Sequence, residues 1–305
     1  MARVGRSFDV AVRHDAARRR VIVNTDARNE ADDQFAIVHA LLSPTLDIRG
    51  IVPAHFGTHR TSDSMAESRA EVDLLLDYLG QRDTTHVANG APHALPDEGT
   101  PVPSAGAELI IGEAMRRDAG PLFVAFLGPL TDMASALLME PRIAERDVTV
   151  VWIGGGPYDG ESAAYWPEFN LANDIAAANA VFSSSLPVWQ VPMPVYIATA
   201  VGYAELDERV APHGPLGAYL ARQLVEFNEA YVAEPIEHRS LGDSPAIGLL
   251  INPSCGRYRE RPAHRFADDG SYDLGVEHRP IRVYDSIDTR YLLEDFYAKL
   301  RRFAR

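Results

Sequence analysis

Apolar segments and helix-patterned segments alternate along most of this chain. Short runs rich in Val, Ile and Leu indicate strands, and between them apolar residues recur every three or four positions, which is the spacing of one helix face. Strands are expected at 20–25, 47–54, 121–127, 148–153 and 187–193, with 84–88 as a weaker candidate. Helices are expected near 32–42, 61–80, 104–118, 130–139 and 174–184. This alternation predicts an α/β fold, with an open and mostly parallel sheet flanked by helices.

The pattern changes in the last third of the chain. From about residue 205 it becomes more helical, with a long helix expected over 214–233. The stretch 256–285 is interpreted as irregular or short-stranded, and its Asp268-Asp269-Gly270-Ser271 cluster as a hairpin turn. No repeat or low-complexity linker divides the 305 residues, so one domain is expected, with 1–19 as a basic leader and 255–305 unassigned.

Composition narrows the class of ligand. The formal charge of −14 argues against a nucleic-acid surface, which needs clustered Lys and Arg. No apolar run approaches the roughly 20 residues that span a bilayer, so no membrane segment is expected. The single cysteine, Cys255, fits a reducing compartment. These features predict a soluble cytoplasmic protein that binds a small molecule.

Three carboxylates crowd together at the end of the first expected strand. Asp26, Asp32 and Asp33 directly follow the β-branched run 21–23, and ligands of open α/β sheets bind at the carboxyl ends of strands. Three acids so close together favour a bound cation. The alternative is that Asp32-Asp33 caps the following helix, but a cap explains one acid and leaves two like charges unexplained.

Two later segments offer further oxygen ligands. The strand at 121–127 breaks at Gly128-Pro129, which exposes the Leu127 carbonyl, and calcium accepts backbone carbonyls as ligands. Asp243 stands before an apolar helix, where the alternative is an N-cap followed by Pro.

The segment 166–174 interleaves aromatic rings with Glu168 and Asn170. If this stretch is extended, both side chains face one way, and rings beside paired polar groups suit a sugar. The alternative is a helix entry with Asp174 or Asn173 as the cap, a role that is compatible with binding.

Taken together and in this order, the segments resemble the inosine-uridine-preferring nucleoside N-ribohydrolase family. The family's Asp-Thr-Asp-Pro-Gly-x-Asp-Asp loop has counterparts in Thr25-Asp26 and Asp32-Asp33. Its Gly-Pro-Leu-Thr-Asn appears as Gly128-Pro-Leu-Thr-Asp132, its Glu-Phe-Asn as 168–170, and its downstream Asp as Asp243. The resemblance runs from about residue 20 to about residue 250.

The resemblance implies a calcium-dependent hydrolase of N-glycosidic bonds, active as a homodimer or homotetramer. Its calcium ligands would be Asp26, Asp33, the Leu127 carbonyl and Asp243. Asp32, Glu168, Asn170 and again Asp243 would hold ribose hydroxyls. Asp26 would also be the general base that deprotonates a calcium-bound water.

The departures from the family pattern concern the metal loop and the leaving group. Asp26 and Asp32 are separated by two extra residues, so the loop must bulge, and Asn24 replaces the family's first Asp. Gly242 replaces a His that protonates the leaving base in many members. His55 and His238 are candidate substitutes, and either could equally be structural. Glu161-Ser162 stands where the family places an Asn against the sugar.

Two functions remain open from the sequence. The first is an enzyme that cleaves a ribonucleoside, or a related ribosylated compound, to ribose and free base. The second is a non-catalytic or altered-substrate protein that keeps the calcium and ribose site. The retained base Asp26 favours the enzyme, because a binding protein has no need of a water activator beside its metal.

Overall fold

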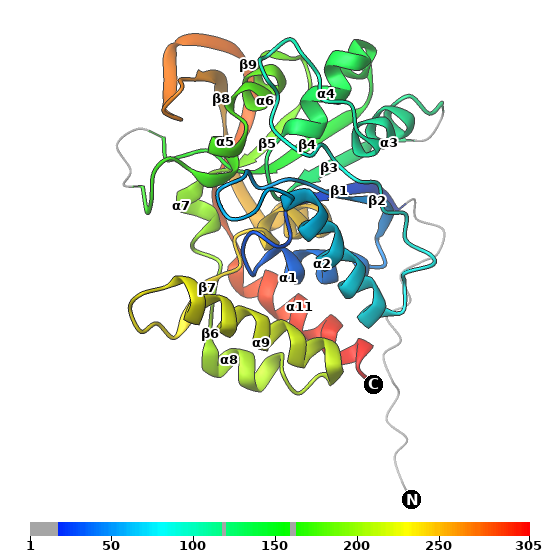
Figure 1. Ribbon diagram of the computed structural model, residues 1–305, viewed down its shortest axis with the longest axis vertical. Coiled ribbons are helices and arrows are strands. Elements are labelled where there is room, and N and C mark those ends of the chain that lie inside the picture. Colours follow the sequence, from blue (N-terminus) through cyan, green and yellow to red (C-terminus); the bar gives the residue numbers. More distant parts are fainter. Residues whose placement is uncertain (1–17, 118–119, 159–162) are drawn as a thin grey trace, which may run out of the picture.

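A single seven-stranded sheet organises the protein (Figure 1). The computed structural model describes residues 18–117, 120–158 and 163–305. The strand order is β2-β1-β3-β4-β5-β9-β8, and every neighbouring pair is parallel except β9 and β8. The strands are β1 (Arg19–Thr25), β2 (Leu46–Pro53), β3 (Leu122–Phe126), β4 (Val148–Ile153), β5 (Val188–Val191), β8 (Gly256–Phe266) and β9 (Tyr272–Ile287). A separate antiparallel pair is formed by β6 (Ala200–Gly202) and β7 (His238–Ser240).

Helices cover both faces of the sheet and make a three-layer arrangement. One face carries α3 (Ala105–Ala114), α4 (Thr131–Met139) and α6 (Ile175–Ser183). The opposite face carries α1 (Asp33–Leu41), α2 (Ser64–Leu79), α9 (Gly214–Tyr231), α10 (Ser244–Ile251) and α11 (Thr289–Phe303). The shorter helices are α5 (Phe169–Asn173), α7 (Met193–Tyr196) and α8 (Tyr203–Arg209), with 3₁₀ turns at Pro141–Glu145 and Pro253–Cys255.

The sheet is buried on both faces, which explains its uninterrupted apolar runs. Val21 and Val23 belong to the hydrophobic cluster on the α1 side, whereas Ile22 between them belongs to the cluster on the α4 side. Successive strand residues point to opposite faces, so a strand covered by helices on both sides needs apolar residues at every position.

The expected fold class is confirmed, and the main expected elements are found within a few residues of their predicted ends. The candidate strand at 84–88 is the exception, because Val87 makes only an isolated parallel bridge with Ile51. The long helix expected over 214–233 is α9. Most of the expected basic leader, residues 1–17, lies outside the described residues.

The interpretation of 256–285 as irregular or short-stranded was wrong, because its two strands are 11 and 16 residues long. The segment forms the long hairpin of β8 and β9, whose turn contains the predicted Asp268–Ser271 cluster, and β9 extends the main sheet beside β5. The alternating pattern is weak because most hairpin positions are exposed or half-buried; the few buried apolar ones include Phe266, Ile281 and Val283. The last unassigned residues form α11, which packs against α1 and α10.

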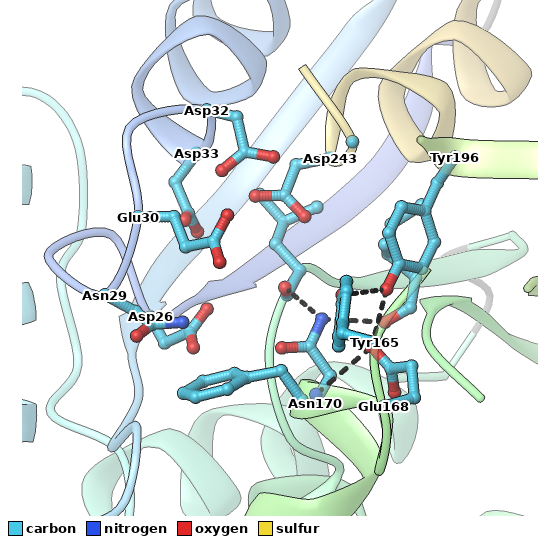
Figure 2. A pocket seen from close by; sticks show the side chains of 14 residues that line it. Asp26, Asn29, Glu30, Asp32, Asp33, Tyr165, Glu168, Asn170, Tyr196 and Asp243 are labelled. Atoms are coloured by element: carbon cyan, nitrogen blue, oxygen red, sulfur yellow. Dashed lines mark hydrogen bonds between the residues drawn. The ribbon is translucent and has the colours of Figure 1, made fainter. Parts of the chain in front are cut away.

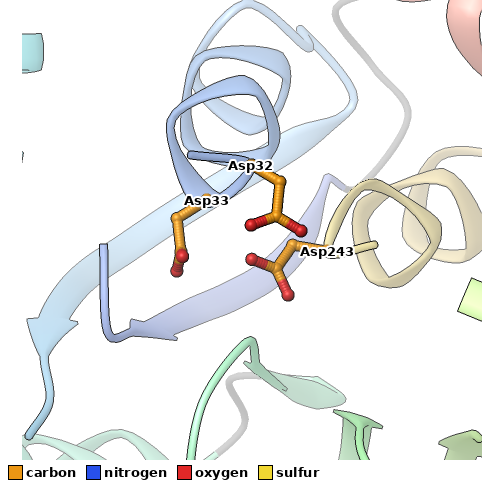
Figure 3. A group of neighbouring side chains, drawn as sticks. All are labelled: Asp32, Asp33 and Asp243. Carbon is orange, nitrogen blue, oxygen red and sulfur yellow. The ribbon is translucent and has the colours of Figure 1, made fainter. Parts of the chain in front are cut away.

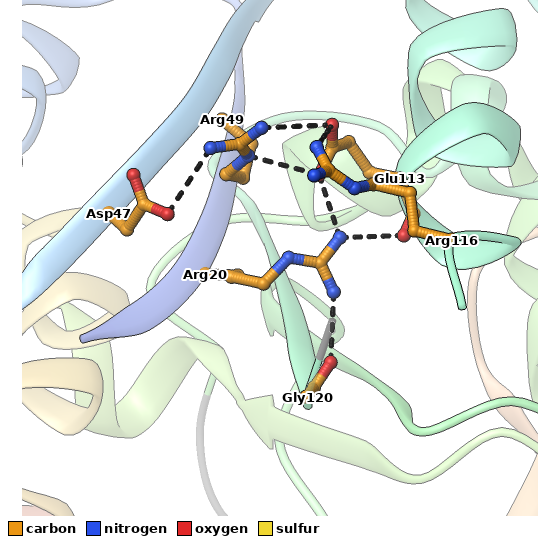
Figure 4. A network of polar contacts seen from close by, with 6 residues as sticks. All are labelled: Arg20, Asp47, Arg49, Glu113, Arg116 and Gly120. Atoms are coloured by element: carbon orange, nitrogen blue, oxygen red, sulfur yellow. Dashed lines mark hydrogen bonds and ion pairs between the residues drawn. The ribbon is translucent and has the colours of Figure 1, made fainter. Parts of the chain in front are cut away.

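The amino ends of β1 and β2 are joined to α3 by a buried ionic cluster (Figure 4). Glu113 accepts hydrogen bonds from Arg20 at 2.7 Å, Arg49 at 3.0 Å and Arg116 at 3.1 Å. Burial acts to raise the pKa of Glu113, but the hydrogen bonds from the three guanidinium groups outweigh it and hold that pKa at about 2. This cluster lies at the end of the sheet opposite to the carboxylates considered next.

Strand order places a ligand site at the other end of the sheet. The chain goes from β1 to β2 on one side and then returns to β3 on the other side of β1. At such a switch point the loops after the strands diverge and leave a crevice beyond the carboxyl ends. No helix in the described part of the chain is long and apolar enough to cross a membrane.

Candidate active site

A pocket occupies this crevice, and the loops after β1, β3 and β4 contribute to it (Figure 2). Its lining is dominated by oxygen-bearing side chains and consists of Asp26, Asn29, Glu30, Asp32, Asp33, Leu127, Ile153, Tyr165, Glu168, Phe169, Asn170, Tyr196, Gly242 and Asp243. The expected metal and substrate ligands all line this pocket, whereas the candidate histidines His55 and His238 do not.

Three aspartates converge on one point of the pocket (Figure 3). Asp32 and Asp33 come from the start of α1 and Asp243 from the start of α10, and one carboxylate oxygen of each lies within 4.8 Å of the other two. Burial first, and then neighbouring carboxylates, raise the pKa of Asp32 to about 7 and that of Asp33 to about 8. The pKa of Asp243 is raised for the same reasons. Such a group of buried acids is costly without a cation and is close enough to share one.

Helix capping does not account for these acids. Asp32 and Asp243 occupy the N-cap positions of α1 and α10, yet neither side chain accepts a capping hydrogen bond. Asp174, by contrast, caps α6 by accepting from the backbone N–H of Ala177, as the sequence suggested. The carboxylates of Asp32 and Asp243 are therefore turned away from their helices and into the pocket.

One carboxylate oxygen of Asp26 accepts no hydrogen bond from the described residues. This oxygen, Oδ2, is buried. Burial, Asp33 and Asp32, in that order, raise the pKa of Asp26 well above its usual value. The side chain packs against Gly128, where an added Cβ would lie 2.8 Å from Asp26 Cγ, so glycine at this strand end makes room for the carboxylate.

The two-residue extension of the loop forms a well-anchored bulge. Gln34 donates to the Ala27 carbonyl at 2.7 Å, and Gln223 of α9 donates to the Ala31 carbonyl at 2.9 Å. The guanidinium of Arg60 hydrogen-bonds to Asn29 between them. The bulge directs Glu30 into the mouth of the pocket (Figure 2).

Glu168 and Asn170 line the pocket, although the stretch that contains them is not extended. Glu168 is the N-cap of α5 and accepts from the N–H groups of Gly155 at 2.8 Å, Asn170 at 3.2 Å and Leu171 at 2.9 Å. The Tyr196 hydroxyl adds a fourth hydrogen bond at 2.9 Å. Glu168 is therefore held in place by four donors.

The amide of Asn170 is oriented by two main-chain carbonyls. Its Nδ2 donates to Leu127 O at 2.8 Å and to Ile153 O at 2.9 Å, the residues that follow β3 and end β4. This fixes Oδ1 as the atom of Asn170 that remains for a ligand. The Leu127 carbonyl, an expected metal ligand, keeps one lone pair beyond this hydrogen bond.

Neither candidate histidine lines the pocket. His55 is buried and donates from Nε2 to Thr131 Oγ1 at 2.8 Å, because the Thr131 hydroxyl itself donates to Asp174 at 2.7 Å. Burial, with a contribution from His93, lowers the pKa of His55 to about 4, so the ring is neutral at pH 7. His238 is exposed on β7 and faces a neighbouring hollow. Glu161-Ser162, the expected departure from the family at the sugar, lies outside the described residues.

Sequence reasoning missed the two tyrosines of the pocket and the glutamate at its mouth. Tyr165 and Tyr196 share a hydrogen bond of 2.5 Å between their hydroxyls. Tyr196 lies on α7, shortly after β5, so its position after a strand's carboxyl end was an available signal. Glu30 lies within the loop extension, which the sequence did identify as a departure.

The chain has relatives of similar length and architecture. "Probable uridine nucleosidase 2" of Arabidopsis thaliana is 26% identical over 262 residues, which cover 80% of each chain. "Pyrimidine-specific ribonucleoside hydrolase RihA" of Salmonella typhimurium is 26% identical over 261 residues, covering 79% of this chain and 82% of the relative. The solved structure of a purine-preferring ribonucleoside hydrolase from Gardnerella vaginalis superposes with a TM-score of 0.77 at 20% identity, covering 94% of this chain and 99% of that one.

These relatives share an architecture and differ in the bases that their names specify, so they agree on the reaction more than on the substrate. Residues 21–290 match the family model described as inosine-uridine preferring nucleoside hydrolase. The match spans the pocket from Asp26 to Asp243. The protein is therefore an N-ribohydrolase and belongs to the inosine-uridine preferring nucleoside hydrolase family.

Proposed function

We propose that this protein is a calcium-dependent ribonucleoside hydrolase in which Asp26 activates the attacking water. The observation that carries the proposal is the buried, unpartnered Oδ2 of Asp26 beside the Asp32, Asp33 and Asp243 cluster. An anionic oxygen without a donor is expensive to bury unless a cation or a water occupies the space in front of it.

The donor set fits calcium. We assign Asp26, Asp33, Asp243 and the Leu127 carbonyl as its ligands, all of them oxygen donors that hard cations prefer. When bound, calcium would lower the pKa of a water and hold vicinal ribose hydroxyls in place. The pocket offers no thiolate or imidazole in its lining, so the ligand chemistry does not favour zinc.

The protein's own groups then perform the hydrolysis. Asp26 takes a proton from the water while the water oxygen attacks the anomeric carbon. The glycosidic C–N bond breaks, and its electron pair leaves with the base. Positive charge develops on the sugar ring in the transition state, and the surrounding carboxylates stabilise it.

We assign the ribose hydroxyls to Asp32, Asp243, Asn170 and Glu168. Asn170 contributes the Oδ1 left after its Nδ2 is committed to two carbonyls. Three of the four hydrogen bonds to Glu168 come from backbone N–H groups, so the Tyr196 hydroxyl is the partner that a ribose hydroxyl can replace.

His55 receives a structural role in this proposal. It is absent from the pocket lining, and its neutral ring holds Thr131 and, through it, Asp174. The single cysteine, Cys255, supports a cytoplasmic location, and family analogy supports a homodimer or homotetramer, which light scattering of the purified protein tests.

Release of free ribose tests the proposal. The assay is run on inosine, adenosine, guanosine, uridine and cytidine with calcium and again after chelation. Ribose released with calcium and lost on chelation supports it. Calcium bound at one ion per chain without release from any of the five would instead favour a protein that has kept the site and changed its substrate.

A further inference from the structure

A second hollow opens directly from the sugar pocket. It shares five lining residues with the pocket. The shared residues are Glu30, Asp32, Tyr165, Tyr196 and Gly242. The hollow adds Ile197, Ile236, His238, Arg239 and Ser240. Because five residues line both spaces, the hollow lies next to the pocket, on the side where a base could extend from a ribose bound there.

Among the described residues that line the pocket and this hollow, Arg239 is the only lysine or arginine. The same lining carries six carboxylates: Asp26, Glu30, Asp32, Asp33, Glu168 and Asp243. A guanidinium in such surroundings is a specific electrostatic feature, because it places a positive charge on one wall of a lining that otherwise carries carboxylates.

The guanidinium of Arg239 is held rigidly in place. Its Nη2 forms an ion pair with Glu30 at 2.6 Å, and its Nη1 donates to Asn228 Oδ1 at 2.9 Å. The ring of Phe227 stacks under it, with its centroid 4.3 Å from Arg239 Cζ. The side chain is 13% exposed, and its Nε is a buried donor without a partner among the described residues. The guanidinium has five N–H groups, and the hydrogen bonds to Glu30 and Asn228 use one on each Nη, so a second N–H on each Nη remains for a ligand.

Breaking a nucleoside C–N bond sends an electron pair onto a nitrogen of the base, and that charge must be neutralised. Gly242 brings no acid to this point, and His55 does not line the pocket. A fixed cation can stabilise the departing base by electrostatics, keeping its own protons while the base later takes one from water.

We propose that Arg239 contacts the leaving base and stabilises the negative charge that develops on it, and that Glu30 positions Arg239. The inference rests on the proposed N-ribohydrolase reaction and adds its leaving-group side. The substrate class is a nucleoside whose base carries a carbonyl oxygen or a ring nitrogen acceptor within reach of the guanidinium. The loop extension thus has a function, because it delivers the carboxylate that fixes Arg239.

Arg60 is the other candidate for the cation that contacts the base, but its surroundings differ from those of Arg239. It lies over the rings of Phe56, Phe227 and Tyr231 in another hollow, which shares only Glu30 with the sugar pocket. Its guanidinium is engaged by Asn29 of the bulged loop. Arg60 is therefore placed to hold the loop.

The test compares two leaving groups on the same sugar. p-Nitrophenyl β-D-ribofuranoside releases a stable phenolate that needs no assistance, whereas inosine and uridine release poor leaving groups. Arg239→Ala should lower kcat/KM for the nucleosides by about 100-fold, the cost of removing one preorganised donor, with the nitrophenyl riboside nearly unaffected. Arg239→Lys should recover part of the nucleoside activity, and Glu30→Gln should show a smaller loss with the same selectivity.

Arg222 of α9 supplies the matched control, because its guanidinium is exposed and contacts Glu226 and the Tyr219 ring of the same helix, outside the pocket and the hollow. Arg222→Ala should change neither rate. Thermal melting and calcium binding establish that each variant is folded; Arg239→Gln replaces Arg239→Ala if the latter is not. If a folded Arg239 variant loses kcat/KM equally on the nucleosides and on the nitrophenyl riboside, the inference is overturned. It is also overturned if the wild type hydrolyses the nitrophenyl riboside but no nucleoside. A wild type that releases ribose from neither substrate overturns the proposed function itself.

Discussion

The ring of Tyr196 fills the space that a side chain at position 242 would need. A Cβ added to Gly242 would lie 2.9 Å from Tyr196 Cδ2 and 3.3 Å from Asp32 Oδ2. The histidine that many members of the family carry at this position would therefore collide with the Tyr196 ring unless that ring moved.

Gly242→Ala tests this relationship. The added methyl group must displace Tyr196 or Asp32, and small shifts of groups that position a substrate are costly, so we expect kcat/KM for nucleosides to fall by about 10- to 100-fold. Gly112→Ala on α3 is the control, because an added Cβ there meets nothing within 4 Å. Equal activity of the two variants would show that the contact is unimportant.

Asp26→Asn separates catalysis from binding. The amide keeps an oxygen for the metal but cannot take a proton from water, so kcat should fall by about 10³-fold, within the range of general base catalysis. Calcium binding, measured by titration calorimetry, should persist with reduced affinity.

Asp243→Ala is the contrasting variant. It removes a carboxylate that we assign to both calcium and ribose, so it should lose both affinities together with activity. An undiminished rate in either variant would contradict the roles assigned to these aspartates.

His55→Gln tests the structural role of His55. Glutamine retains a donor for Thr131, so any loss of rate should be equal for inosine and p-nitrophenyl riboside. The folded-state pKa of about 4 lies below the usual 6.5, so the native state binds fewer protons than the unfolded state and the protein loses stability as pH falls through this window. Between neutral pH and pH 4.5, the melting temperature of the variant should fall less than that of the wild type. A loss confined to inosine would identify His55 as a leaving-group acid.

Glu113→Gln should lower stability at neutral pH by about 1 to 2 kcal/mol, because it removes the negative charge that Arg20 and Arg49 share, and solvent around Arg49 screens part of that interaction. The pKa of Glu113 is held at about 2, below its usual 4.5, so its contribution is complete above pH 4.5 and disappears as pH falls toward 2. The melting curves of variant and wild type should converge over that range. Glu294→Gln, which breaks an exposed pair with Arg209, should have little effect at any pH.

The core of the fold and the acids of the site were predictable from the sequence for physical reasons. A parallel sheet buried on both faces makes continuous apolar runs such as 21–23, and the residues that follow those runs must meet at one edge. Asp26, Asp32 and Asp33 follow such a run, and Asp243 was placed by its resemblance to a family motif.

What escaped prediction depends on tertiary neighbours. The β8–β9 hairpin has few buried positions, so its alternation is faint. Helix α11 did carry a signal, since Leu292, Phe296 and Leu300 recur every four residues and are buried. Tyr196 and Arg239 come from segments with no motif. The place of Tyr196 after β5 was a weak signal, and the contacts that single out these residues, with Glu168 and Glu30, are visible only in the fold.

A calcium titration of metal-free protein tests the central claim most directly. Calcium is removed by chelation and gel filtration, then restored stepwise while bound calcium and ribose release from the best nucleoside are measured on the same samples. The account predicts that activity is absent at the start and rises in proportion to bound calcium, reaching its maximum at one ion per chain. Full activity in the metal-free protein, or calcium binding that leaves the rate unchanged, would contradict it.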